Sequence, residues 1–388
     1  MTNPHAPSRR LRAVCFSPYP IQGPSVYHRI WAYRDDWIAH GIDLTLWPFM
    51  SDRFYVRRRR FGWFATLEKL IRFIGATIKL LVRLPSVLRY DVVIIHRELF
   101  PIGPLILERI LFWLNPNVIF DVDDAIWHPP SNPVHQRRLF WSKQRVPKLL
   151  AASRAVVAGS AYLAQFARRY NDRVTIIPTP YDDLGERGNS TDPRKPVVVW
   201  IGNLGNAEYL LTILPVLEKL AQSCGFTLRL IGGDDVRHIR SAVVDIDYCR
   251  WRRDLEAKWL KESDIGIMPL ADGEYERGKC AFKLVQYFSA SLPVIASPVG
   301  MNCQVIRDGV NGFLASDDDQ WYQTLRTLLN DPAQRREVGQ RGHQTFLERF
   351  TRSANAERWR RVFLAQCEPP ESSGRAGAAP ANPDHSGL

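Results

Sequence analysis

Residues 278–300 read GKCAFKLVQYFSASLPVIASPVG, and this stretch does most to decide the fold. A glycine turn is followed by apolar side chains at helical spacing over 281–291. The apolar run 292–296 then predicts a short buried strand, which ends before the glycine turn at Gly300. A helix that leads directly into a buried strand is typical of parallel α/β sheets.

Two lysines lie at the start of the predicted helix. Lys279 and Lys283 are four residues apart, so their ammonium groups can converge on one side of the first turn. Free backbone N–H groups and the helix dipole favour an anion at the same place. The stretch therefore predicts that Gly278, Lys279 and Lys283 bind a phosphate-bearing ligand.

Short apolar strands alternate with helical patterns along the rest of the chain, which predicts a parallel α/β architecture. The strands predicted before the polar stretch 182–195 are 13–17, 44–48, 92–96, 118–120, 155–158 and 174–177. Those predicted after it are 197–201, 227–231, 265–268 and 294–296. The polar stretch has the composition of a linker.

Two doubly wound, Rossmann-like domains facing a central cleft are therefore expected, at residues 1–182 and 196–350. A last helix is predicted within 351–367. Residues 368–388 are rich in Pro, Gly, Ala and Ser and are expected to be disordered.

Composition limits the class of protein. The 388 residues include 45% hydrophobic and 24% charged residues, as in ordinary globular proteins. The net charge of +12 favours anionic partners. Six scattered cysteines without a metal-binding pattern, no visible secretion signal and no apolar run near the roughly 20 residues of a membrane span predict a cytoplasmic protein.

The 278–300 stretch resembles the donor-binding region of retaining GT-B glycosyltransferases, in particular the family 4 group (glycosyl transferases group 1). Those enzymes have a Glu, a Gly-rich turn, a second Glu eight residues after the first, and a small-residue strand. Here Gly278 stands at the first Glu position and Gln286 at the second. The resemblance implies metal-independent transfer from a nucleotide-diphosphate sugar without a further cofactor. It also implies that the final helix crosses back onto the N-terminal domain.

Donor-binding residues are implied at two further places. The strand 197–201 leads into a glycine loop, where Gly202, Asn203 and Gly205 would meet the diphosphate. Gln286 would hydrogen-bond the ribose hydroxyls. A plain strand-to-helix turn and a helix surface residue are the structural alternatives. Glu276, on the preceding loop, would contact the sugar in a catalytic role together with Lys279, or remain an exposed loop carboxylate.

Acceptor-binding residues are implied in the first domain. Gly23, Ser25, Tyr27 and His28 follow the first strand, where a helix cap at Ser25 is the alternative. Asp121, Asp123 and Asp124 follow a later strand, and Asp123 is expected to be a catalytic or acceptor-side group. Metal ligation by these carboxylates is the lesser alternative. His96, Arg97 and Glu98 end the strand before and are expected to line the same cleft or to form a structural ion pair.

Residues 57–84 combine an arginine run with an amphipathic helical pattern. Such a helix can lie on an anionic membrane surface, or pack on the core with a charged outer face. A protein peripheral to the inner face of the membrane is one expectation from this segment. Nucleic acid is not expected as a partner, since no RNA- or DNA-binding motif accompanies the basic residues.

The function expected from these observations is sugar transfer to a glycan or lipid-linked acceptor in the synthesis of a cell-envelope polysaccharide or glycoconjugate. Two alternatives remain open at this point. One is a GT-B nucleotide-sugar epimerase. The other is a non-catalytic, membrane-associated partner in polysaccharide assembly.

Overall fold

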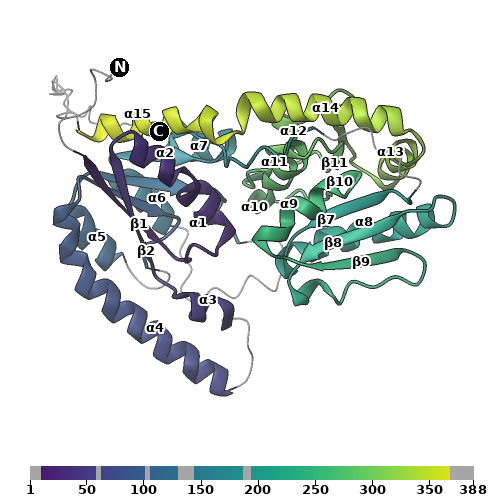
Figure 1. The fold of residues 1–388 in the computed structure, drawn as a ribbon. Helices are drawn as coiled ribbons and strands as arrows, with labels where there is room; N and C mark the ends of the chain where they lie inside the picture. The colour runs from purple at the N-terminus through teal and green to yellow at the C-terminus, as the bar shows by residue number, and fades with distance from the viewer. Residues whose placement is uncertain (1–9, 58–62, 101–104, 130–143, 187–193, 368–388) are drawn as a thin grey trace, which may run out of the picture.

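The computed structural model describes residues 10–57, 63–100, 105–129, 144–186 and 194–367, which form two α/β domains (Figure 1). Each domain is built on a six-stranded sheet. The strands of the first sheet are β1 (Leu11–Ser17), β2 (Ile42–Pro48), β3 (Val92–His96), β4 (Val118–Val122), β5 (Ala155–Ala158) and β6 (Val174–Ile176). Those of the second are β7 (Val197–Ile201), β8 (Thr227–Gly232), β9 (Asp245–Arg250), β10 (Ile265–Met268), β11 (Val294–Ala296) and β12 (Phe313–Leu314).

The strand order places the loops that could bind a ligand. The sheets have the orders β2-β1-β3-β4-β5-β6 and β12-β11-β10-β7-β8-β9, and their neighbouring strands are parallel. In each sheet the later strands lie on both sides of the first strand, β1 or β7, so the strand order switches sides at that strand. Ligands of open α/β sheets bind at the carboxyl ends of strands at such a point. The loops after β1 and β7 are therefore the expected walls of a site.

Helices flank both sheets (Figure 1). Those of the first domain are α1 (Pro24–Arg29), α2 (Arg34–Ala39), α3 (Asp52–Arg57), α4 (Trp63–Arg83), α5 (Ile106–Leu114), α6 (Arg145–Ala152) and α7 (Ala161–Ala167). Those that follow are α8 (Leu204–Ala221), α9 (Arg253–Lys261), α10 (Glu274–Arg277), α11 (Phe282–Ser289), α12 (Asn302–Val305), α13 (Asp318–Asn330), α14 (Pro332–Arg349) and α15 (Arg352–Cys367). Short 3₁₀ turns include η1 (Trp31–Tyr33), η2 (Leu84–Arg89) and η4 (Asp234–Val236).

The last helix returns to the first domain, as the resemblance to GT-B enzymes implied. α14 covers the second domain, and α15 continues over α2 (Figure 1). Trp359 and Phe363 of α15 pack edge-on against Trp37 of α2, with ring centroids 5.5 and 4.8 Å apart. All three aromatic side chains are fully buried, so their apolar surface fixes the crossing.

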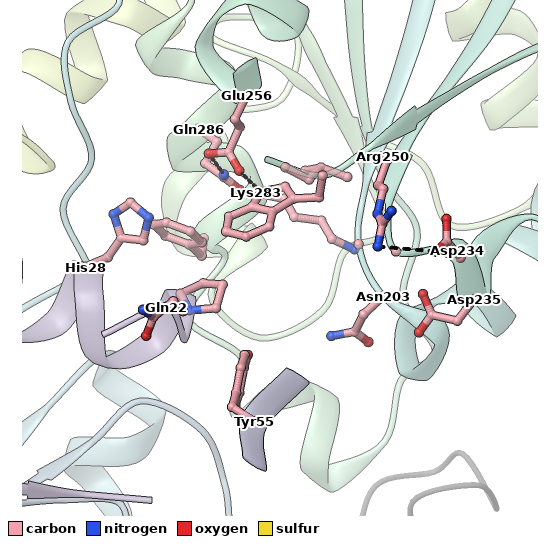
Figure 2. Close-up of a pocket in the computed structure, with 16 residues that line it drawn as sticks. Gln22, His28, Tyr55, Asn203, Asp234, Asp235, Arg250, Glu256, Lys283 and Gln286 are labelled. Atoms are coloured by element: carbon pink, nitrogen blue, oxygen red, sulfur yellow. Dashed lines mark hydrogen bonds and ion pairs between the residues drawn. The ribbon is translucent and has the colours of Figure 1, made fainter. Parts of the chain in front are cut away.

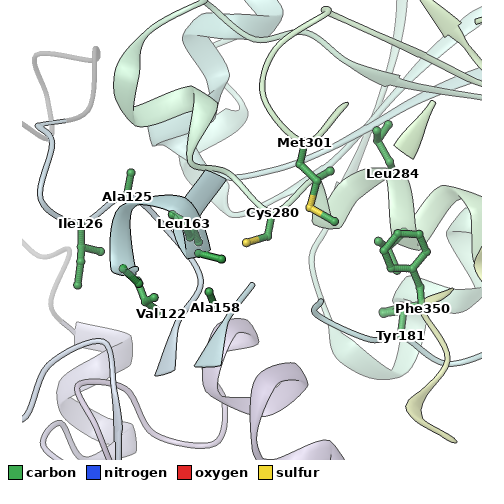
Figure 3. Packing of buried hydrophobic residues seen from close by; sticks show 14 of the residues in the cluster. Val122, Ala125, Ile126, Ala158, Leu163, Tyr181, Cys280, Leu284, Met301 and Phe350 are labelled. Atoms are coloured by element: carbon green, nitrogen blue, oxygen red, sulfur yellow. The ribbon is translucent and has the colours of Figure 1, made fainter. Parts of the chain in front are cut away.

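The two domains share part of one core. A cluster of buried apolar side chains runs from Val122, Ala125 and Leu163 in the first domain to Cys280 and Leu284 in the second (Figure 3). Packing of this kind excludes water from the contact between the domains. The loop 278–281 therefore lies against the first domain in this structure.

The helix α4 differs from the expectation of a charged outer face. It lies at the outer edge of the first domain (Figure 1). Its exposed side chains include Phe64 at 72% and Val82 at 73%, whereas Leu80 is buried. Of the predicted segment 57–84, residues 58–62 lie outside the described residues, as do the predicted tail 368–388 and part of the linker. No helix of the described ranges is long and apolar enough to cross a membrane.

Candidate functional site

Two neighbouring cavities open between the domains. The larger has a volume of about 600 Å³ and is lined by Gln22, His28 and Tyr55 from the first domain. The second domain contributes the loop after β7 and one face of α11 (Figure 2). The smaller cavity, of about 210 Å³, lies between Asp123 of the first domain and Lys279 of the second. Both lie at the strand ends where the topology favours ligands.

Lys283 lines both cavities. Its ammonium group lies over the ring of Trp200, 4.7 Å from the centroid, and extends toward the side of the larger cavity where Asn203 and Arg250 lie (Figure 2). Burial, followed by the charge of Lys279, lowers the pKa of Lys283 to about 7. An anion bound here would favour the charged form of this lysine.

Lys279 lines the smaller cavity from the loop before α11. Its Nζ donates to Oδ1 of Asn206 at 3.2 Å and lies 4.9 Å from the ring centroid of Tyr275. The two predicted lysines therefore meet at the boundary between the cavities, beside the first turn of α11. Amides of a helical first turn have no partner within the helix and can bind an anion.

The loop after β7 approaches the larger cavity through Gly202 and Asn203. A Cβ atom at Gly202 would lie 2.5 Å from the indole of Trp200, so only glycine fits. Gly205 lies in the first turn of α8 and is not among the residues that line either cavity. The structure thus places Gly202 and Asn203 in the same cavity wall as Lys283, whereas Gly205 is not part of that wall.

Gln286 is buried in the wall of the larger cavity and is not a helix surface residue. Its Nε2 donates to Oε1 of Glu256 at 2.8 Å. Glu256 is also buried and lines the same cavity from α9. Tyr181 donates to the first oxygen of this carboxylate and Trp251 to the second.

In the first domain, two side chains, those of Arg29 and His96, bind the buried carboxylate of Asp121. Arg29 forms a completely buried ion pair with it, from α1. His96, at the end of β3, places Nδ1 at 2.6 Å from Oδ2 of Asp121. Asp121 is therefore occupied by protein groups.

Asp123 lines the smaller cavity and receives the guanidinium of Arg97. Arg97 also binds Asp124. Burial alone would raise the pKa of Asp123, but Arg97 and then His96 outweigh it and hold this pKa well below its ordinary range. Asp123 is thus a stable anion, better suited to accept a hydrogen bond from a hydroxyl than to remove its proton.

A hydrogen-bond chain connects these carboxylates. Oγ of Ser25 lies 2.7 Å from Nε2 of His96 and donates to Oδ2 of Asp123 at 2.6 Å. Ser25 has one hydrogen, and ionised carboxylates only accept. The single hydrogen of Ser25 is therefore directed to Asp123 in this chain. No three His, Cys, Asp or Glu side chains in the described part of the chain form a metal-binding group.

The remaining predicted acceptor residues divide between the cavities and the domain contact. His28 lines the larger cavity, and burial, aided by Arg253 and Arg352, lowers its pKa to about 3, so the ring is neutral. Tyr27 does not line either cavity but lies under the guanidinium of Arg253, 3.7 Å from the ring centroid. Gly23 forms the turn before α1.

Glu276 and Gly278 do not lie where the sequence placed them. Glu276 is not an exposed loop carboxylate: it lies on α10, is fully buried and accepts a hydrogen bond from Tyr209. It is not among the residues lining either cavity, so its catalytic assignment gains no geometric support. Gly278 does not line a cavity either, but contacts Ala125 of the first domain.

Sequence reasoning missed the wall formed by Arg250, Trp251 and Glu256. Arg250 is the last residue of β9, Trp251 follows it, and Glu256 lies in α9; the sequence did not predict β9 as a strand. β9 is the edge strand of its sheet, is only partly buried and has no apolar run. The interval between the predicted strands 227–231 and 265–268 is long enough for a further strand, and this interval was the signal that could have found β9.

Residues 195–331 match the family model described as Glycosyl transferases group 1. A comparison with curated proteins finds no match. The matched residues comprise the loop after β7, the wall at Glu256 and the whole of α11.

Solved structures resemble the chain over nearly its full length. HepE from Anabaena, in complex with UDP and glucose, covers 92% of this chain and 100% of its own, at 14% identity and a TM-score of 0.63. A glycosyltransferase from Rickettsia africae covers 92% and 99%, at 12% identity and a TM-score of 0.64. Sucrose-phosphate synthase from Thermosynechococcus elongatus covers 92% and 100%, at 15% identity and a TM-score of 0.64. The fold is GT-B. The prediction of two Rossmann-like domains is confirmed, while the domain boundaries and the site residues stay predictions.

Proposed function

We propose that this GT-B protein is a glycosyltransferase that moves a sugar from a nucleotide-diphosphate sugar to a glycan or lipid-linked acceptor. One observation carries the proposal: Lys283 joins two cavities between the domains, beside Gly202 and Lys279. The family match of the second domain supports it. So does the resemblance to HepE, whose structure holds UDP and glucose.

In the proposed reaction, the bond between the anomeric carbon and the diphosphate breaks, the acceptor oxygen bonds to that carbon, and the proton of the acceptor hydroxyl passes to the departing diphosphate oxygen. Negative charge develops on the departing diphosphate. Lys279, Lys283 and the first-turn amides of α11 would stabilise this charge more strongly in the transition state than in the bound donor. Because these groups supply positive charge, we propose that no metal or other cofactor takes part.

The acceptor would enter from the side of the first domain. Ser25 and Asp123 lie across the smaller cavity from Lys279. The ionised Asp123 would accept a hydrogen bond from the acceptor hydroxyl and orient its oxygen. Retention of the anomeric configuration is part of the proposal and rests on the resemblance to the family 4 group.

We further propose that α4 holds the protein on the inner, anionic face of a membrane. Its exposed apolar side chains recur every three or four residues and are Phe64, Leu67, Ile71, Ile74, Ile78 and Leu81. α4 also carries four basic residues and one acidic residue, Glu68, which pairs with Arg72 at 2.7 Å. Two copies of this helix would bring like charges together, whereas anionic lipid would neutralise them. A peripheral location would suit a lipid-linked acceptor of cell-envelope polysaccharide synthesis.

A thermal-shift series with UDP-, GDP-, ADP- and dTDP-sugars tests the transferase proposal. At least one of them should raise the melting temperature of the unmodified protein. Lys279→Ala and Lys283→Ala should each remove most of that shift, whereas Lys261→Ala, an exposed lysine of α9, should keep it. Release of nucleoside diphosphate that depends on an added acceptor would then distinguish transfer from epimerisation. Stabilisation that survives both cavity variants would contradict the proposed diphosphate site.

A further inference from the structure

Glu256 is a buried carboxylate in the wall of the larger cavity, on the short helix α9. Its hydrogen-bond donors among the described residues are neutral: the hydroxyl of Tyr181, the indole N–H of Trp251 and the amide of Gln286. A carboxylate offers about four acceptor positions, so three donors leave room for one more. A buried anion of this kind is stabilised further by each added hydrogen bond.

The bond to Glu256 also orients Gln286. Because a carboxylate only accepts, the side-chain nitrogen of Gln286 faces Glu256 at 2.8 Å. The carbonyl oxygen of the Gln286 amide then points away from Glu256. Figure 2 shows both side chains together at one end of the cavity. This end of the wall thus combines a carboxylate with an amide carbonyl and favours a ligand that brings hydroxyl donors.

The distance from the proposed diphosphate position indicates which hydroxyls these are. Lys283 and Gln286 are three residues apart on α11, so they share a face and are separated by about 4.5 Å along the helix axis. Lys283 stands where the cavities meet, so a diphosphate there would extend the nucleoside to one side and the sugar to the other. The larger cavity, of about 600 Å³ against about 210 Å³, suits the nucleoside.

We propose that Glu256, together with Gln286, binds the vicinal diol of the donor's ribose, and that the protein therefore selects ribonucleotide sugars over 2′-deoxyribonucleotide sugars. The inference rests on the proposed function, since it places the diphosphate at Lys283. In this arrangement the negative charge beside the ribose comes from Glu256 of α9, and α11 contributes only the neutral amide of Gln286. A site whose acceptors are directed at a hydroxyl discriminates strongly against an analogue that lacks it.

The test compares matched pairs of ligands on the full-length protein. Dissociation constants are measured calorimetrically for UDP and 2′-deoxy-UDP, and likewise for the guanine and adenine pairs. The unmodified protein should prefer the ribonucleotide by about tenfold or more, because the hydroxyl donates to a charged group. In Glu256→Gln this preference should fall close to unity. Glu262→Gln, an exposed residue just after α9, serves as the matched control and should keep the preference.

A structural role for Glu256 gives a different result. If the residue only held Tyr181 and Trp251 in place, its substitution would weaken both members of each pair equally and leave their ratio unchanged. The exchange variant Glu256→Gln with Gln286→Glu returns a carboxylate to the site and should restore the preference. An unchanged ratio in Glu256→Gln overturns this inference and leaves nucleotide binding intact. If no nucleoside diphosphate binds the unmodified protein, the proposed function fails first and the inference with it.

Discussion

Lys283 lies at the boundary of the two cavities, and its ionisation governs how an anion binds there. Its pKa is lowered to about 7 by burial and by Lys279, so the unliganded protein holds a mixture of amine and ammonium near neutral pH. A bound diphosphate favours the ammonium form. Binding therefore takes up a proton, and affinity falls as the pH rises through the lowered pKa.

We expect the affinity for a nucleotide sugar to fall about tenfold for each pH unit above about 7. The diphosphate of a nucleotide sugar is doubly esterified and keeps its charge over this range, so the slope reports on the protein. Calorimetric titration at several pH values measures it. Lys283→Arg keeps a permanent charge and should remove the slope. A flat profile in the unmodified protein would contradict the role of Lys283.

Sequence reasoning succeeded for residues that lie close together in the chain. Lys279 and Lys283 are four residues apart, with Lys283 in the first turn of α11 and Lys279 in the loop before it, so their nearness in the chain sufficed to place both at one end of the helix. The pair of Arg29 and Asp121 is different, because its members are 92 positions apart and come from α1 and β4. Only the packing of the sheet shows that Asp121 is occupied by protein groups and that Asp123 faces the cavity.

The proposed contact of α4 with a lipid surface can be tested by substitution of its exposed isoleucines. Ile71→Asp combined with Ile78→Asp should lower binding to vesicles containing phosphatidylglycerol by more than about tenfold, since each change removes an apolar side chain from the proposed lipid contact. The two isoleucines are 61% and 56% exposed, so the fold should be unaffected. Co-sedimentation with vesicles measures the binding, and circular dichroism checks the fold.

The control for α4 uses the same type of substitution elsewhere. Val243 is 51% exposed but lies in the second domain, and Val243→Asp should leave vesicle binding unchanged. Vesicles of phosphatidylcholine alone should bind the unmodified protein more weakly, because the basic residues of α4 then lack anionic partners. Equal retention of the double variant on anionic vesicles would exclude α4 as the contact.

The elements found from the sequence are those with a clear burial pattern. Strands such as β3 and β7 are buried at every position and appear as continuous apolar runs. β9 and β12 were missed for physical reasons. β9 lies at the sheet edge with the polar sequence DIDYCR, and β12 has two residues. The wall at Glu256 follows β9, so missing the strand meant missing that part of the site.

At the scale of the whole molecule, the site depends on how the two domains meet. Cys280 Sγ lies 3.0 Å from the carbonyl oxygen of Asp123. Arg253 reaches the carbonyl oxygen of Ile21 at 2.8 Å. Gly278 lies against Ala125, where an added Cβ would be 2.3 Å from the alanine Cβ. The sequence predicted a cleft, but the partners across it come from loops that no local pattern relates.

Gly278→Ala should therefore hold the domains apart. Gly278 has φ −82° and ψ −4°, which alanine adopts without strain, so the effect is confined to the clash with Ala125. We expect transferase kcat/KM to fall by about tenfold or more, because donor and acceptor groups no longer meet in the reacting geometry. Small-angle scattering should show a larger radius of gyration, while the melting of each domain changes little.

Two further variants separate this clash from a general cost of replacing glycine. Gly225→Ala lies in the same domain, where the new Cβ would meet only Lys195 at 3.9 Å, and it should leave activity and scattering unchanged. Adding Ala125→Gly to Gly278→Ala removes the contact between the two Cβ atoms and should recover part of the activity. Ala125 N would still lie 2.9 Å from the new Cβ, so recovery should be incomplete. Full activity and unchanged scattering in Gly278→Ala alone would mean that the active form does not use this domain contact.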